Sequence, residues 1–133
     1  MKKVLALLLT LCLCVTLSAC ATMETFESNL GDKYSKTILD DDDLEDYADL
    51  LDIEVDDYSI KSAIEAKHKT KYTSVVIIQC ANNTKAKKLA NDAEDIIGML
   101  ENTFSSAYSF DIVVKSSFVL FGESTAIDDA LGN

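Results

Sequence analysis

The chain has 133 residues, of which 23 are aspartate or glutamate and 12 are lysine, and it contains no arginine, proline or tryptophan. The formal net charge of −11 argues against nucleic-acid binding, because such binding depends on cationic contacts to phosphate. This length is typical of a single domain with a core of its own.

The first twenty residues have the parts of an export signal. Lys2 and Lys3 give a basic start, residues 4–17 are apolar apart from two threonines, and Leu17-Ser18-Ala19-Cys20 follows. This tetrapeptide resembles the lipobox of bacterial lipoproteins, and the resemblance covers residues 1–20 only. It implies cleavage between Ala19 and Cys20 and a diacylglyceryl group on the Cys20 thiol. Two acyl chains give a stable anchor, since each buried methylene contributes about 0.8 kcal/mol.

Two alternatives remain open for this segment. A retained transmembrane helix needs roughly 20 apolar residues, whereas the run here is shorter and is followed by Glu24 and Glu27 instead of basic residues. An ordinary secretory signal would leave Cys20 without lipid. The lipoprotein interpretation predicts anchoring to the membrane at its extracytoplasmic face, or to the outer membrane if the source has one.

The same interpretation divides the chain into three parts. Residues 1–19 are predicted as the signal peptide, 20–39 as the lipid anchor and tether, and 40–133 as a single α+β domain. Without the leader, ten lysines face 23 carboxylates, a formal charge of −13. We therefore expect an anionic membrane surface to repel the domain, without help from a polybasic segment. Only Cys20 and Cys80 remain, and Cys20 would carry lipid, so no disulfide is expected.

Hydrophobic periodicity predicts the elements of the domain in chain order. A weak pattern over residues 33–39 indicates a short strand. The elements after it are a helix over 42–51, strands over 57–67 and 72–80, a long helix from Asn82 or Asn83 to Phe104, strands over 109–115 and 118–122, and a short helix capped by Ser124.

From residue 57 onward, the order strand-strand-helix occurs twice. Sequential hairpins favour an antiparallel sheet. The predicted fold class is therefore α+β, a two-layer sandwich in which a four-stranded antiparallel sheet carries its helices mainly on one face.

The second face of this sheet is too apolar to remain exposed as one patch. If alternate residues of each strand face the helices, a candidate partner surface remains on the other side, formed by Val75, Ile77, Val113, Val119 and Phe121. Either the 42–51 helix covers it, with Leu44, Tyr47 and Leu51, or a protein partner does.

Residues 40–57 hold eleven carboxylates and no basic residue. The first of them form a candidate surface for a cation or a cationic partner: Asp40, Asp41, Asp42, Asp43, Glu45 and Asp46. The alternative is helix capping and a solvated face, because aspartates suit a helix start. Calcium loops usually turn at a central glycine, which this stretch lacks, so no metal site is predicted.

Reactive residues are few. His68 is the only histidine and lies between two lysines at a strand end, where a surface residue is expected. Cys80 ends an apolar strand, as a small buried hydrophobe would. Neither a nucleophile elbow nor a phosphate-binding glycine loop is present, so no catalytic residue and no cofactor are predicted.

Three functions are compatible with these observations. The first is a lipid-anchored, non-catalytic module of the cell envelope that binds a protein or a small ligand. The second is a small envelope hydrolase that uses carboxylates, which would require two of them to converge across a deep pocket. The third is a structural or inhibitory envelope protein that recognises a partner through the second sheet face.

Overall fold

The computed structural model describes residues 21–51, 53–103 and 109–133, with the backbone alone at 50–51 and 95–103. They form a five-stranded antiparallel sheet in the order β1-β2-β3-β5-β4. The strands are β1 (Tyr34–Ile38), β2 (Ser62–His68), β3 (Ser74–Gln79), β4 (Phe110–Lys115) and β5 (Phe118–Glu123). The α+β class is confirmed, and the strand-strand-helix order occurs twice, as β2-β3-α4 and β4-β5-α5, but the sheet has five strands and not the predicted four.

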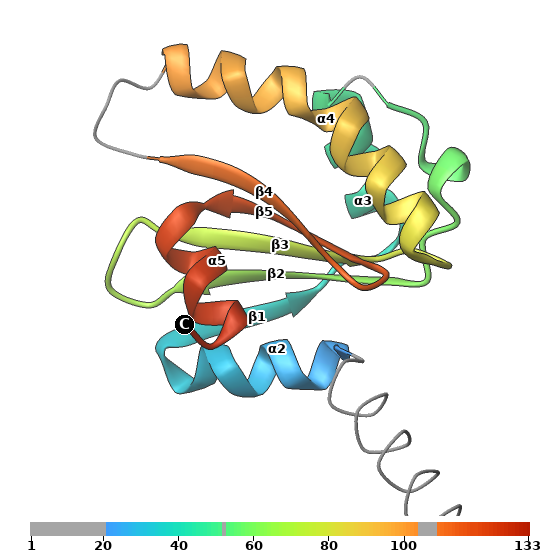
Figure 1. The fold of residues 1–133 in the computed structure, drawn as a ribbon. Helices are drawn as coiled ribbons and strands as arrows, with labels where there is room; N and C mark the ends of the chain where they lie inside the picture. The colour runs from blue at the N-terminus through green and yellow to red at the C-terminus, as the bar shows by residue number, and fades with distance from the viewer. Residues whose placement is uncertain (1–20, 52, 104–108) are drawn as a thin grey trace, which may run out of the picture.

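Helices cover both faces of the sheet (Figure 1). α2 (Met23–Leu30) and α5 (Ser124–Leu131) lie on one face, and α3 (Asp41–Leu51) and α4 (Asn83–Thr103) lie on the other. Two short 3-10 helices, η1 (Gly31–Lys33) and η2 (Val55–Tyr58), lie in the connections. The structure has three layers, so the predicted two-layer sandwich with helices mainly on one face is also wrong.

Among the described residues, no helix combines the length and the apolarity needed to cross a membrane. The helices there are instead amphipathic covers of the sheet. α2, for example, buries Phe26 and Leu30 and leaves Glu24 exposed.

The extra strand and the extra helix come from residues 20–39, which were predicted as a tether. From Ala21 onward these residues belong to the folded domain. Phe26 of α2 packs edge-on against Phe118 of β5, with ring centroids 5.0 Å apart. β1 pairs along β2 from Tyr34↔His68 to Ile38↔Ile64. The sequence signal was weak because β1 is an edge strand in which Tyr34 alone is buried.

The pairing register decides which residues share a face. Residues directly opposite each other in an antiparallel pair point to the same side. Ile77 pairs with Ile64 of β2 and with Leu120 of β5, so these three lie on the α2/α5 face. Val119 and Phe121, which were predicted to share a face with Ile77, lie on the opposite face, because a register error of one residue reverses every assignment in a strand.

Most local signals were interpreted correctly. Asn82 caps α4, since its side-chain oxygen accepts from the Lys85 N–H at 2.9 Å. The start of α5 differs from the prediction, because the Glu123 carboxylate, and not Ser124, accepts from the first amides of the helix. The strand predicted from residue 57 begins later, at Ser62, after the 3-10 turn η2 has placed Tyr58 in the core.

At Gly122, β5 passes close to the backbone of β3. Its φ is +146°, and a Cβ built there would lie 2.4 Å from the Ser74 carbonyl oxygen. We expect Gly122→Ala to lower the free energy of unfolding by roughly 2–4 kcal/mol, through backbone strain and overlap. Urea denaturation measures the loss.

Gly132→Ala is the matched control, since Gly132 also has positive φ, +79°, but meets only the flexible side chain of Asn29. It should cost about 1 kcal/mol. Equal losses in the two variants would contradict the close approach of β5 to β3.

Candidate functional site

The residues predicted as a partner surface are packed into the core, with Val113 and Phe121 partly buried and the other three fully buried. Val75, Ile77 and Val119 are each 0% exposed. Val75, Ile77 and Val113 belong to the cluster beneath α2 and α5, whereas Val119 and Phe121 belong to the cluster beneath α3 and α4. This prediction is wrong, because the five residues point to opposite faces and the chain covers both.

Tyr47 does pack on Phe121 as proposed for the 42–51 helix, with ring centroids 6.1 Å apart. The side chain of Leu51 lies outside the described residues.

The acidic stretch caps a helix. Asp40 Oδ1 accepts from the Asp43 N–H at 2.9 Å, and Asp43 Oδ2 accepts from the Asp40 N–H at 3.1 Å. This reciprocal pair satisfies amides at the start of α3, where the helix dipole favours negative charge. Asp41, Asp42, Glu45 and Asp46 are exposed around it. Within the described ranges, no group of three or more ligating side chains could hold a metal ion.

Three tyrosines each donate their hydroxyl to a carboxylate on another element. Tyr34 of β1 donates to Asp129 of α5 at 2.7 Å. Tyr58 of η2 donates to Asp92 of α4 at 2.8 Å, and Tyr47 of α3 donates to Glu65 of β2. These bonds tie the covering elements to each other and to the sheet.

The tyrosine hydroxyls are held in their neutral form. Burial, and after it the hydrogen bond to the carboxylate, raises the pKa of Tyr34 to about 12. The same two causes, in the same order, raise the pKa of Tyr47 and of Tyr58 above the ordinary tyrosine value. Neutral phenols that donate to carboxylates stabilise the fold and are not poised to act as bases near neutral pH.

Two of the accepting carboxylates are held in their charged form. The hydrogen bond from Tyr58, with that from Lys88, lowers the pKa of Asp92. Burial alone would raise the pKa of Glu65, but the hydrogen bonds from Lys67 and Tyr47 outweigh it, so its pKa is also lowered.

An acidic hollow of about 540 Å³ lies between the end of α3, η2 and α4, and carboxylates line it: Asp49, Glu54, Asp57 and Asp92. A hydrolytic general acid needs a carboxyl group whose pKa is raised. The carboxyl group of Asp92 in this hollow is in the opposite state, because the hydrogen bonds from Tyr58 and Lys88 lower its pKa. Lys88 also lies 4.8 Å from the centroid of the Tyr58 ring.

A second hollow, of about 490 Å³, is lined by residues 67–74, which join β2 to β3. We call this segment the basic loop. It contains Lys67, Lys69 and Lys71, all exposed, and Tyr72, whose exposed fraction is 93%. Its composition is the reverse of the acidic hollow: in a chain rich in carboxylates, this loop has none.

His68 holds the basic loop in shape. Its Nδ1 accepts from the N–H groups of Thr70 and Lys71, both at 3.1 Å. Its ring lies edge-on against the Tyr34 ring, with centroids 5.0 Å apart. The His68 N–H donates to the Thr73 carbonyl oxygen at 2.9 Å. The histidine therefore organises the turn, and the nitrogen that a general base would use is already occupied by amides.

Cys80 is buried, as predicted. Its exposed fraction is 1%, and burial raises the pKa of its thiol to about 11. A thiol in that state is a poor nucleophile at neutral pH.

Sequence reasoning missed the basic loop as a site, although a signal for it was present. Lysine at every second position, followed by an aromatic residue, stands out in a chain whose remaining composition is acidic. The two predicted anchor residues, Ala19 and Cys20, lie outside the described residues. No protein-family model, curated protein or solved structure matches the chain.

The tyrosine–carboxylate bonds predict acid sensitivity. The folded pKa values of Asp92 and Glu65 lie below the ordinary values of 3.8 and 4.5. Their stabilisation is therefore complete above about pH 5 and is lost as the pH falls through the folded values. Tyr58→Phe should lower the free energy of unfolding by about 1 kcal/mol at pH 7 and by less at pH 3. Urea denaturation at the two pH values tests this, with exposed Tyr72→Phe as the neutral control.

The role of His68 is tested by removing its acceptor nitrogen while keeping a ring against Tyr34. In His68→Phe, amide hydrogen exchange at Thr70 and Lys71 should accelerate by roughly fivefold, the equivalent of about 1 kcal/mol. Exchange in the centre of β3 should not change. Unaltered protection of the two loop amides would show that the histidine does not organise the turn.

Proposed function

We propose that the mature chain is a lipoprotein, held by lipid on Cys20 at the extracytoplasmic face of the membrane, and that its domain binds a ligand or partner and does not catalyse a reaction. The lipobox tetrapeptide supports the anchor. The use of the polar side chains within the fold supports a binding module.

The start of α2 is the observation that carries this proposal. Thr22 has extended backbone angles, φ −123° and ψ 157°, and its side chain accepts from the Thr25 N–H. α2 thus has its own N-cap two residues after Cys20. Cleavage before Cys20 would remove none of the described elements, and Phe26 and Leu30 would keep their places in the core.

Binding is favoured over catalysis by the state of the reactive groups described above. The only histidine has its Nδ1 engaged by two amides, and the Cys80 thiol is buried. Asp92, in the acidic hollow, is bound by Tyr58 and Lys88. The hydrolase alternative would need a hollow lined by carboxylates, and the acidic hollow is one. The lowered pKa of Asp92 keeps this carboxyl group ionised, which disfavours it as a proton donor.

Replacement of the proposed acceptor sulfur tests the anchor. In cells that express the full chain, Cys20→Ser should abolish incorporation of labelled fatty acid and block lipid-dependent cleavage. Cys80→Ser is the matched control, because it removes the other cysteine of the mature chain and should leave labelling intact.

Mass spectrometry of the N-terminal peptide is the second measurement. The proposal expects a peptide that begins at Cys20 and carries a diacylglyceryl group. An intact leader, or a free thiol at a cleaved Cys20, would refute the anchor.

A further inference from the structure

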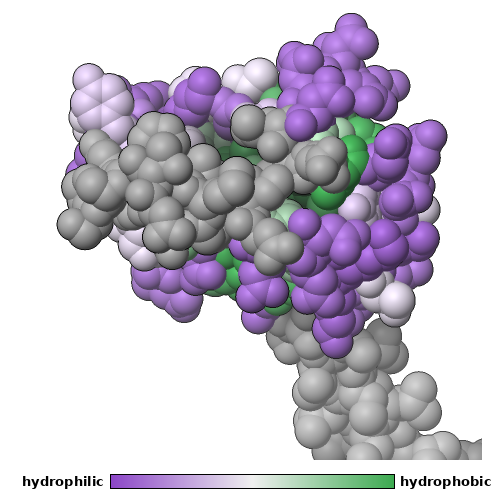
Figure 2. All heavy atoms as spheres, turned by 90° about the horizontal axis from the view of Figure 1, so that it is seen from above, coloured by the Kyte–Doolittle hydropathy of each residue, from purple (hydrophilic) through white to green (hydrophobic). Residues whose placement is uncertain are grey.

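Charge is unevenly distributed over this domain. Residues 40–57, which form α3, η2 and their connection, hold eleven carboxylates and no lysine. Figure 2, which looks onto the α3/α4 side, shows hydrophilic side chains crowded over this part of the surface. The α2 flank, defined as residues 21–38 together with the basic loop, has five lysines against three carboxylates. α5 and its N-cap add three carboxylates to this face, Glu123, Asp128 and Asp129, so the α2/α5 side is close to neutral and the strongly negative net charge belongs mainly to the α3/α4 side.

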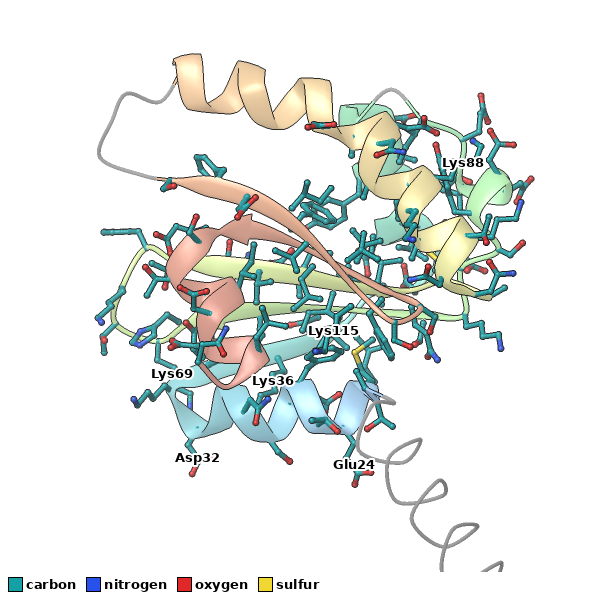
Figure 3. All side chains as sticks on the ribbon, in the orientation of Figure 1. Glu24, Asp32, Lys36, Lys69, Lys88 and Lys115 are labelled. Atoms are coloured by element: carbon teal, nitrogen blue, oxygen red, sulfur yellow. The ribbon has the colours of Figure 1, made fainter. Side chains whose placement is uncertain are left out.

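The basic loop is joined to the end of α2 that lies away from Cys20. The Lys69 N–H donates to the Lys33 carbonyl oxygen at 2.9 Å, which fixes the loop beside η1. Figure 3 shows Lys69 and Asp32 at this end of the molecule, with Lys88 at the far end. α2 has eight residues, which span about 12 Å. The loop therefore lies roughly one short helix away from the proposed anchor.

The connection between the anchor and the domain is too short to hold the α2 flank far from a bilayer. Ala21 is only half-exposed and packs against the core cluster beneath α2. A polar headgroup layer of roughly 5–7 Å on each leaflet surrounds the hydrocarbon. With lipid on Cys20, the lysines of the basic loop would lie within reach of that layer.

We infer that the basic loop docks on the headgroups of anionic phospholipids and so orients the anchored domain, with α2 toward the bilayer and the acidic α3 side away from it. This inference rests on the proposed lipid anchor. Lys69 and Lys71 supply the attraction to phosphate. Lys67 contributes less, because its Nζ forms an ion pair with Glu65 Oε1 at 2.7 Å. Tyr72 is the interfacial residue, since an aromatic ring with a hydroxyl prefers the headgroup level.

Two features of the loop suit this role. His68 fixes the turn before contact, so docking would not need to order it. The hollow lined by the loop gives space for a headgroup phosphate beside the lysines. Glu24 of α2 and Asp32 of η1 project on the same flank (Figure 3) and oppose the attraction, so the docked state should be weak and sensitive to salt.

A single tryptophan can report docking, because the chain has none of its own. The full chain with Tyr72→Trp is purified from membranes and reconstituted into phosphatidylcholine vesicles with or without about one-third phosphatidylglycerol. Lipids brominated near the headgroup should quench the fluorescence in the anionic vesicles and much less in the neutral ones. Added salt should remove the difference, since it screens the lysines.

Charge variants identify the contact. Lys69→Gln with Lys71→Gln should lower the ratio of docked to undocked protein by roughly 25-fold, at about fivefold for each lysine. The matched control, Lys61→Gln with Lys87→Gln, changes the net charge equally at two exposed positions outside the loop and should keep the quenching. A tryptophan placed at Lys87 on α4 should not be quenched in either kind of vesicle.

The outcomes separate this inference from the anchor. Equal quenching in neutral and anionic vesicles, or quenching that persists in the loop variant, would overturn docking whatever the N-terminal mass shows. Loss of the signal on addition of glycerol 3-phosphate at constant ionic strength would overturn the lipid as ligand and assign the loop to a soluble phosphate ester. An unlipidated N-terminus refutes the anchor and with it the inference that rests on the anchor, whereas a lipidated protein that fails the quenching tests refutes docking alone.

Discussion

Burial of β3 on both faces is the constraint on which the rest of the structure depends. Val75 and Ile77 are 0% exposed toward α2 and α5, while Val76 and Ile78 are 6% and 3% exposed toward α3 and α4. A strand of this kind is stable only when both sheet faces are covered. One cover combines the two ends of the described chain, α2 and α5, and the other comes from its middle. The N-terminal segment is therefore part of the core and cannot act as a loose tether.

The periodic elements were predictable from sequence, and the reason is local. The apolar run of β3 and the repeat of α4 carry strong signals over several residues. α2 was missed because it is short, and the strand predicted over 33–39 was left out of the sheet because β1 buries only Tyr34 and gives a weak signal. The division of apolar residues between the two faces was mistaken because it depends on the register between strands, which a single sequence does not specify.

The polar interactions were predictable only where they are local. Aspartates ahead of an apolar-periodic run predicted the cap of α3, and Asn82 predicted the cap of α4. The tyrosine–carboxylate bonds were not visible, since Tyr34 and Asp129 are 95 positions apart and Tyr58 and Asp92 are 34 apart. The alternating lysines of the basic loop were visible, but the net charge concealed their meaning. A sum over the chain treats the carboxylates of α3 and the lysines near α2 as if they acted at one place.

The expectation that an anionic bilayer repels the domain follows from the total net charge of the chain. The uneven distribution of this charge over the two sides of the sheet leads to a different expectation. Screening confines an exposed charge to an influence of about 8–10 Å, so the side that faces the bilayer matters more than the total. A covalent lipid anchor would already hold the basic loop near the headgroups, and its contact would then be intramolecular. Lysines that each contribute about 1 kcal/mol could not recruit the protein from solution against its own carboxylates. They would be sufficient to select one orientation of a domain that a lipid anchor had already brought to the surface.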